Sequence, residues 1–171
     1  MSDTVNWLVH DHRKYEAALD ECEMAAGAGE WKEAVRLFNN FVDDLKLHMR
    51  MEDEVLYPLF KEEHGDPRGV IADLSEEHEE LVRLVQDLAY VIKTNDVDHF
   101  EESLLPLHKA IARHNEHEEA VFLSMGTESL LMRRDEIMER LNALQVTGGQ
   151  PGWDIEVRRP WGSRLRQALF V

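Results

Sequence analysis

The sequence predicts an all-α protein, namely an up-down-up-down antiparallel four-helix bundle of two pseudo-repeated helical hairpins, with a short fifth helix and a C-terminal tail. Three observations predict this fold. Apolar residues recur in alternating steps of three and four along four long stretches, as in helices that each bury one face. Short connections separate the stretches. The apolar stripes also superpose under one repeat shift, which carries Val5 onto Ile71 and Phe38 onto Leu104, as two tandem hairpins would.

The first hairpin consists of two expected helices. The first covers about residues 3–26, because Gly27-Ala28-Gly29 follows as a suitable C-terminal cap. The second covers about residues 30–63 and ends at His64-Gly65. Pro58 lies inside it, and a proline inside a helix removes a backbone donor. We therefore expect a kink in the last turns of this helix.

The second hairpin and the fifth helix follow the same logic. The third helix covers about residues 66–94 and opens with an Asp-Pro pair, an N-cap before a proline at the first helical position. The fourth begins after Asn95-Asp96, continues to about Met125 and contains Pro106. A shorter fifth helix is expected over residues 129–144.

The chain is expected to divide after residue 146. Residues 1–146 would form the bundle with its fifth helix, and residues 147–171 a linker with an Arg- and Trp-rich tail. The tail holds four arginines and two acidic residues, whereas the rest of the chain is strongly acidic. It is expected either to fold back over the bundle or to dock a second subunit, which would give a homodimer.

The composition limits the partners of the chain. It has 19 Lys+Arg against 35 Asp+Glu, a formal charge of −16. This excess of negative charge would repel the phosphates of nucleic acid and an anionic membrane face, so neither partner is expected. No apolar stretch approaches the roughly 18 residues of a membrane-spanning helix. No secretory signal is visible, and a cytoplasmic location is expected.

Six positions on the apolar stripes hold histidine or glutamate instead of an apolar residue. They form three pairs, each related by the same repeat shift as the stripes. At about 1.5 Å per residue from the turns, all six fall in one layer of the bundle. Two His-x-x-x-Glu pairs each present both members on one helix face. The six residues are His12, His48, Glu52, His78, His114 and Glu118.

Two interpretations of this polar layer are open. Four imidazoles and two carboxylates cost several kcal/mol to bury without partners, so they must satisfy one another in a hydrogen-bonded network or bind metal. A metal site accounts better for their placement on the stripes at a single repeat distance. Imidazole with carboxylate suits non-haem iron, manganese or zinc, and the single cysteine, Cys22, excludes a thiolate cluster. The two glutamates come from opposite halves and could bridge two cations.

These segments resemble the hemerythrin-like (HHE) cation-binding domain over roughly residues 1–125. The resemblance rests on His12 in HDHRKYEAAL, His48 and Glu52 in HMRMEDEVLYPLF, His78 in SEEHEELVRLV, and His114 and Glu118 in HNEHEEAVF. It implies two non-haem iron ions (Fe2+/Fe3+) with an oxo or hydroxo bridge as cofactor. By the same resemblance, His12 and His48 would serve one metal, His78 and His114 the other, and both glutamates would bridge.

The resemblance also implies a function. The small-molecule partner would be a diatomic ligand or peroxide, that is O2, nitric oxide or a peroxide, bound or reacted at the metal pair. If the protein is an enzyme, it would be a di-iron oxidoreductase. The alternative is a non-enzymatic iron-binding or oxygen- or iron-sensing module. Oxygen-carrying hemerythrins have a further histidine where this chain has Leu74, whose repeat mate is Leu8. We expect this departure to favour redox chemistry or iron handling over reversible O2 storage.

The residues around the six are expected to play ordinary roles. Tyr15 and Glu16 are candidates for a replacement ligand, but Tyr15 fits core packing and Glu16 a solvated position or one behind the ligands. His117 lies off the stripes and is expected to be background. The acidic pairs Glu76-Glu77 and Glu79-Glu80 are expected to form a solvated face, with attraction of iron as the alternative, and Cys22 is expected to be a small core residue.

Overall fold

The computed structural model describes residues 7–66, 68–124 and 133–146, and these residues contain helices and no strand. The all-α prediction is therefore confirmed for the described part of the chain. The helices are α1 (Trp7–Gly27), α2 (Trp31–Met51), the π-helical turn η2 (Glu52–Leu56), α3 (Tyr57–His64), α4 (Val70–Thr94), α5 (Val97–Ser124) and α7 (Arg134–Val146).

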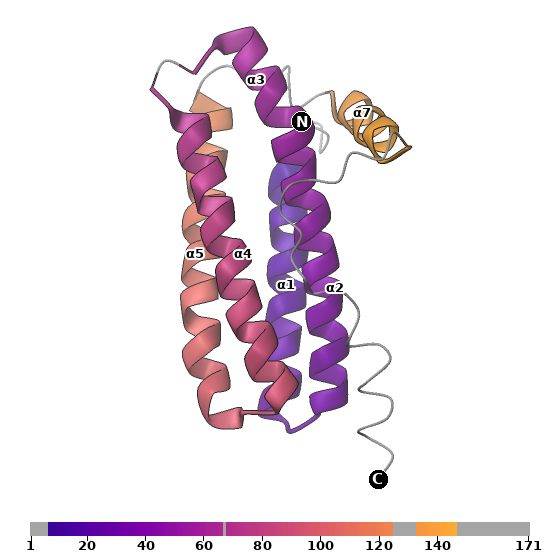
Figure 1. The fold of residues 1–171 in the computed structure, drawn as a ribbon, viewed down its shortest axis with the longest axis vertical. Helices are drawn as coiled ribbons and strands as arrows, with labels where there is room; N and C mark the ends of the chain where they lie inside the picture. Colours follow the sequence, from indigo (N-terminus) through magenta and orange to yellow (C-terminus); the bar gives the residue numbers. More distant parts are fainter. Residues whose placement is uncertain (1–6, 67, 125–132, 147–171) are drawn as a thin grey trace.

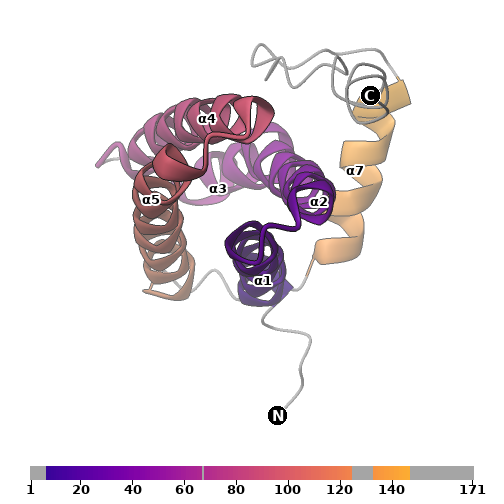
Figure 2. The ribbon, with the colours of Figure 1, turned by 90° about the horizontal axis from the view of Figure 1, so that it is seen from below.

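The long helices α1, α2, α4 and α5 lie lengthwise beside one another (Figure 1) and surround a common centre when the molecule is seen from its end (Figure 2). The most extensive packing is within the pairs α1–α2 and α4–α5, which are consecutive in the chain. Further contacts join α1 to α5 and α2 to α4. None of the described helices combines the length and the apolar character of a membrane span.

The two pairs are closed by the same kind of turn. Gly29 after α1 has a left-handed φ of 76°, and Asn95 after α4 has a φ of 51°. At each turn the next residue donates its backbone N–H to a carbonyl in the last turn of the helix, Glu30 to Ala25 at 2.8 Å and Asp96 to Val91 at 3.2 Å. This is the Schellman cap, which satisfies carbonyls at a helix end. The repeat shift carries Gly29 onto Asn95, so the repeat extends to the turns.

The second expected helix differs from its prediction at Pro58. Its range is occupied by α2, η2 and α3 in direct succession, and Pro58 is in the first turn of α3, immediately after η2. In η2 the backbone N–H of Tyr57 bonds to the carbonyl of Glu52, the longer step that defines a π turn. The π turn therefore lies just before the proline at which the sequence predicts a kink, and α3 is tilted away from the axis of α2 (Figure 1).

Other expected boundaries also shift. The helix expected from residue 66 begins at Val70, because Gly69 has a left-handed φ of 71° and interrupts the backbone before it. Asp66 still accepts a hydrogen bond from the backbone of Ile71 at 3.4 Å. The expected fifth helix corresponds to α7, but residues 129–132 of the prediction lie outside the described residues. So do Pro67, residues 3–6, the end at Met125 and the whole tail, 147–171.

The apolar core is divided into two clusters by a polar layer. One cluster lies toward the hairpin turns and includes Phe41 and Leu104, together with Cys22 as predicted. The other lies toward the opposite end and includes Leu74 and Phe122. Ile137 of α7 is fully buried in this second cluster, where α7 packs against η2 and α2. Buried polar side chains occupy the layer between the clusters.

Candidate metal centre

The polar layer contains all six residues that the sequence singles out. Each of them is at most 4% exposed, although each is polar or ionisable. They come from every long helix, since α1, α2 and α4 each supply one histidine, η2 supplies one glutamate, and α5 supplies both a histidine and a glutamate. The structure therefore brings the six together between two apolar clusters.

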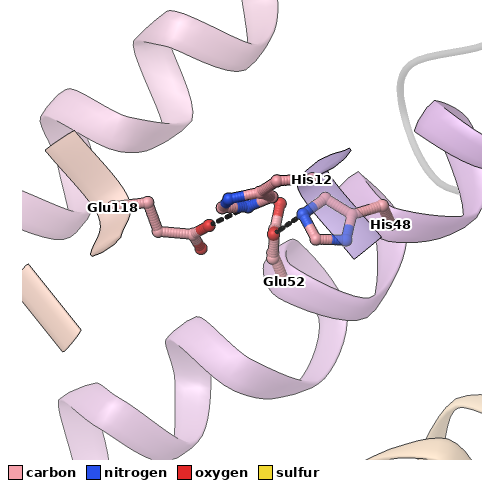
Figure 3. Close-up of side chains that lie close together, drawn as sticks. All are labelled: His12, His48, Glu52 and Glu118. Atoms are coloured by element: carbon pink, nitrogen blue, oxygen red, sulfur yellow. Dashed lines mark hydrogen bonds and ion pairs between the residues drawn. The ribbon is translucent and has the colours of Figure 1, made fainter. Parts of the chain in front are cut away.

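A first group joins His12, His48, Glu52 and Glu118 (Figure 3). One ligand atom from each of these residues lies within 4.8 Å of those of the other three. His12 Nε2 is 3.1 Å from Glu118 Oε2, and His48 Nε2 is in close contact with Glu52 Oε1. Both hairpins thus contribute an imidazole or a carboxylate to the same small space.

A second group joins Glu52, His78 and His114, again with ligand atoms within 4.8 Å of one another. His78 Nε2 is 3.2 Å from Glu52 Oε2 and 3.2 Å from His114 Nε2. Glu52 belongs to both groups and directs one oxygen to each. A carboxylate placed in this way has the geometry needed to bridge two cations.

Several atoms of the cluster have no hydrogen-bond partner among the described residues. They are both ring nitrogens of His48, both carboxylate oxygens of Glu52, and Oε1 of Glu118. The short contact between His48 and Glu52 lacks the directionality of a hydrogen bond, so it does not satisfy either group. Buried carboxylates without partners are costly, and a cation would satisfy several of these atoms at once. The donor set of imidazole and carboxylate fits non-haem iron, manganese or zinc.

A second row of carboxylates orients the imidazoles from behind. The Nδ1 of His12 bonds to Glu119 at 2.9 Å, and the Nδ1 of His78 bonds to Asp53 at 3.0 Å. When Nδ1 donates to a carboxylate, the Nε2 lone pair is left facing the centre of the cluster. The sequence analysis missed both acids because they lie off the apolar stripes. A signal was present, since Asp53 and Glu119 directly follow the two stripe glutamates and are themselves related by the repeat shift.

One expectation about the surroundings holds only in part, and another was wrong. Glu76 and Glu79 are exposed as expected, but Glu77 is half-buried and accepts hydrogen bonds from His114 Nδ1 and from His117 Nδ1, both at 2.9 Å. His117 is consequently not background, because it shares this carboxylate with a residue of the cluster. A glutamate one residue before a stripe histidine lies close enough to the buried face to turn inward, which the stripe pattern does not reveal.

Two tyrosines border the cluster. Tyr15 is buried as predicted and donates its hydroxyl to Asn115, whose amide donates to Glu16 at 2.5 Å. Among the described residues, Glu16 does not belong to a group of clustered carboxylate and imidazole atoms. Tyr57, which the sequence analysis missed, stacks on His78 with ring centroids 5.6 Å apart. Burial and the nearby carboxylates raise the pKa of both phenols well above the usual range, so both stay protonated.

Electrostatics in the metal-free cluster favour charged pairs. Burial alone would lower the pKa of His12, but the hydrogen bond that His12 donates to Glu118 and the charges of Glu118 and Glu52 outweigh it and raise this pKa to about 9. The pKa of His78 is likewise raised to about 10 against the effect of burial, by Asp53 and Glu52. Burial would raise the pKa of Glu52, but His48 and His78 hold it well below its usual range. A cation entering this cluster must therefore displace protons from imidazoles.

The comparison with protein families agrees with this chemistry. Neither a curated protein nor a solved structure matches the chain. The family model of the hemerythrin HHE cation binding domain matches residues 3–126, which include every helix that contributes to the cluster. The match spans well over half of the chain, and so this protein belongs to the hemerythrin HHE cation-binding domain family.

Proposed function

We propose that the buried cluster holds two non-haem iron ions bridged by carboxylates. His12 and His48 would hold one ion, His78 and His114 the other, and Glu52 and Glu118 would lie between them. The observation that carries this proposal is the position of Glu52, whose two oxygens face imidazoles from opposite hairpins at the boundary of two ligand groups. The unpartnered oxygens of Glu52 and Glu118 support it further.

The function we propose is binding of, or reaction with, O2, peroxide or nitric oxide. A pair of iron ions supplies the electrons and the open coordination positions that such molecules require. The chain's own residues would keep the site dry and ordered. Apolar clusters cover it on both sides, and carboxylates behind three of the four imidazoles fix their Nε2 atoms toward the centre.

We further propose that this reaction is redox chemistry or iron handling rather than reversible O2 storage. Leu74 and Leu8 lie where a further imidazole would be needed, and both are packed in the second apolar cluster with at most 1% exposure. The ions would then have four imidazoles between them. A stable, reversible oxygenated form, obtained by exposing the anaerobically reduced protein to O2, would contradict this part of the proposal.

The up-down-up-down bundle is part of the same proposal, because it would let each hairpin supply one pair of imidazoles. The short turns at Gly29 and Asn95 and the packing of α1 on α2 and of α4 on α5 support it. Contacts of α1 with α5 and of α2 with α4 agree with a closed arrangement of the four helices.

Metal analysis of protein purified in air, with visible spectra before and after reduction, tests the proposed centre. We expect two iron ions per chain and an absorption that bleaches on reduction. Glu52→Gln removes the shared negative charge at nearly constant volume and should abolish binding of both ions. His99→Ala, at an exposed position on α5, is the matched control and should bind both. Metal-free protein that stays folded yet takes up no ferrous iron would overturn the proposal.

A further inference from the structure

A pocket of about 110 Å³ lies beside the cluster, lined by residues of α1, α2 and α7. Its lining combines charged side chains of α1 and α2, namely Asp11, Lys14 and Asp44, with Tyr15, His48 and, from α7, Met138. Asp11, Lys14 and Asp44 are the more exposed of these, with side chains 25%, 59% and 33% exposed, and they form the outer part of the pocket. Tyr15 and His48 are buried and form its inner part.

His48 belongs to both the pocket and the cluster. It is only 4% exposed, its Nε2 contacts Glu52, and its ring also lines the pocket. Its second nitrogen, Nδ1, is turned away from Glu52 (Figure 3) and has no hydrogen-bond partner among the described residues. The other three imidazoles of the cluster each have a carboxylate on Nδ1. His48, whose Nδ1 is not held by a carboxylate among the described residues, therefore lies between the pocket and the first ligand group.

The charges of the outer part suit a cation. Two carboxylates and one ammonium group leave one net negative charge there, on a chain with a formal charge of −16. Lys14 donates to Asp44 at 2.8 Å, and Asp11 lies 3.5 Å from His10. Exposed ion pairs of this kind contribute little free energy, so Lys14 can leave Asp44 when another cation arrives. Carboxylates can take over part of the water shell of a divalent metal ion before it reaches imidazole ligands.

We propose that this pocket is the route by which a divalent metal cation reaches the His12/His48 half of the centre, with Asp11 and Asp44 as transient outer ligands and the His48 ring as an inner gate. The inference rests on the proposed function, because the ion it delivers is one that the cluster would hold. It makes the two metal positions kinetically unequal. The ion at His12 and His48 loads and leaves faster than the ion at His78 and His114.

Rapid mixing of the metal-free full chain with Co2+, followed by its visible d–d absorption, tests the route, and anaerobic Fe2+ uptake repeats the test with the proposed metal. Asp11→Asn and Asp44→Asn should each slow the fast phase by about tenfold at low ionic strength, and Lys14→Gln should accelerate it by a similar factor. Leu47→Trp adds bulk to a half-exposed lining position without changing charge and should also slow loading.

Two controls carry the same change in net charge outside the pocket lining. Asp43→Asn is next to Asp44 on an exposed position, and Arg13→Gln is next to Lys14. Both should change the rate by less than about twofold. The spread among the charge variants should shrink at about 0.5 M salt, where screening is strong. All variants should still bind two ions at equilibrium.

The possible outcomes distinguish failure of the proposed entry route from failure of the proposed metal centre. Wild-type loading rates in Asp11→Asn, Asp44→Asn and Leu47→Trp, with two ions still bound, would overturn the route and leave the metal centre intact. A wild-type chain that binds no cation at equilibrium would overturn the proposed centre and the route together.

Discussion

The two helical hairpins contain the same candidate ligands at positions related by the repeat shift, but the Nδ1 atom of the second histidine has a carboxylate partner in only one of them. His114 Nδ1 bonds to Glu77 at 2.9 Å, whereas His48 Nδ1 has no partner among the described residues. The repeat mate of Glu77 is Asp11, which lines the pocket beside His48 instead. The C-terminal hairpin is therefore the fixed half of the layer and the N-terminal hairpin the open half.

A second difference lies at the two glutamates. Glu118 lies within the regular helix α5, whereas Glu52 begins the π turn η2. The repeat shift carries Tyr15 of the first hairpin onto Leu81 of the second. The first hairpin therefore has a hydroxyl group, bonded to Asn115, at a position where the second hairpin has an apolar side chain. Six candidate ligands that are nearly symmetric in sequence therefore have unequal backbone and side-chain surroundings in the two halves. Two half-sites with the same ligand types can for this reason differ in metal affinity and in the rate of metal exchange.

The largest expected effect concerns the carboxylates behind the imidazoles. Glu77→Gln should lower the affinity of the centre for Co2+ or Fe2+ by about 10- to 100-fold, because loss of such a partner weakens imidazole orientation and basicity. Asp11→Asn, at the equivalent position of the open half, should change the equilibrium affinity by less than about threefold. Competition with a chelator of known affinity measures both.

A symmetric pair serves as the control for this comparison. Asp53→Asn and Glu119→Gln each remove the partner of the first histidine in one half, and their effects on affinity should be similar. Equal losses in Glu77→Gln and Asp11→Asn would contradict the distinction between a fixed and an open half.

An intermediate effect is expected from pH on the metal-free protein. The pKa of His12 is raised from 6.5 to about 9 and that of His78 to about 10, the carboxylates outweighing burial in both cases. A raised folded-state pKa contributes stability that is fully present below pH 6.5 and is lost as pH rises through 9 and 10. The pKa of Glu52 is lowered from 4.5, so Glu52 contributes stability to the folded state that is present above pH 4.5 and is lost as the pH falls below it.

Thermal unfolding of the metal-free protein should therefore show a falling melting temperature between about pH 7 and pH 10. Bound metal should remove much of this fall, because it requires the neutral imidazole that high pH favours. A melting temperature of the metal-free protein that stays constant over this range would show that the imidazoles are not charged in the folded cluster.

The smallest effect separates the two turns. Gly29→Ala should destabilise the protein by about 1 kcal/mol, because alanine resists the left-handed φ of 76°. The cost is conformational, since no atom lies within 4 Å of the position of the added Cβ. Asn95→Gly, at the matching turn, should stay within about 0.5 kcal/mol of wild type. Urea unfolding measures both, and equal losses would show that the two turns do not share their cap.

The six residues of the polar layer were predictable because they occupy positions where a helix stripe should be apolar. Their periodicity indicates which face of the helix each side chain lies on, and the common repeat distance indicates that all six lie in the same layer of the bundle. The same logic could not find Glu77, because an acid beside a stripe looks like an ordinary solvated residue until the packing of a neighbouring helix is known. His117 was misjudged for the same reason.

The backbone details were less predictable. A π turn needs no special residue types, and the segment after Glu52 has a composition equally suited to an α-helix. The sequence showed that Pro58 lies within a helical stretch, but it did not show that a π turn lies just before this proline. The start of α4 was placed too early because the Asp-Pro pair is a good helix start by itself, and Gly69 then overrides it with a left-handed backbone.

The π turn also changes the direction in which all later side chains of the helix point. One extra residue in a turn rotates all later side chains by about 100° relative to an uninterrupted α-helix. This rotation lets the segment bury Leu56 and Phe60 as well as Val55 and Leu59, each at most 4% exposed, while α7 covers η2. Removing that residue would swing Tyr57 off His78 and leave the ligands before it in place. The π turn thus lets the side chains before it, which include His48, and the side chains after it, which pack in the second apolar cluster, face directions that an uninterrupted α-helix could not combine.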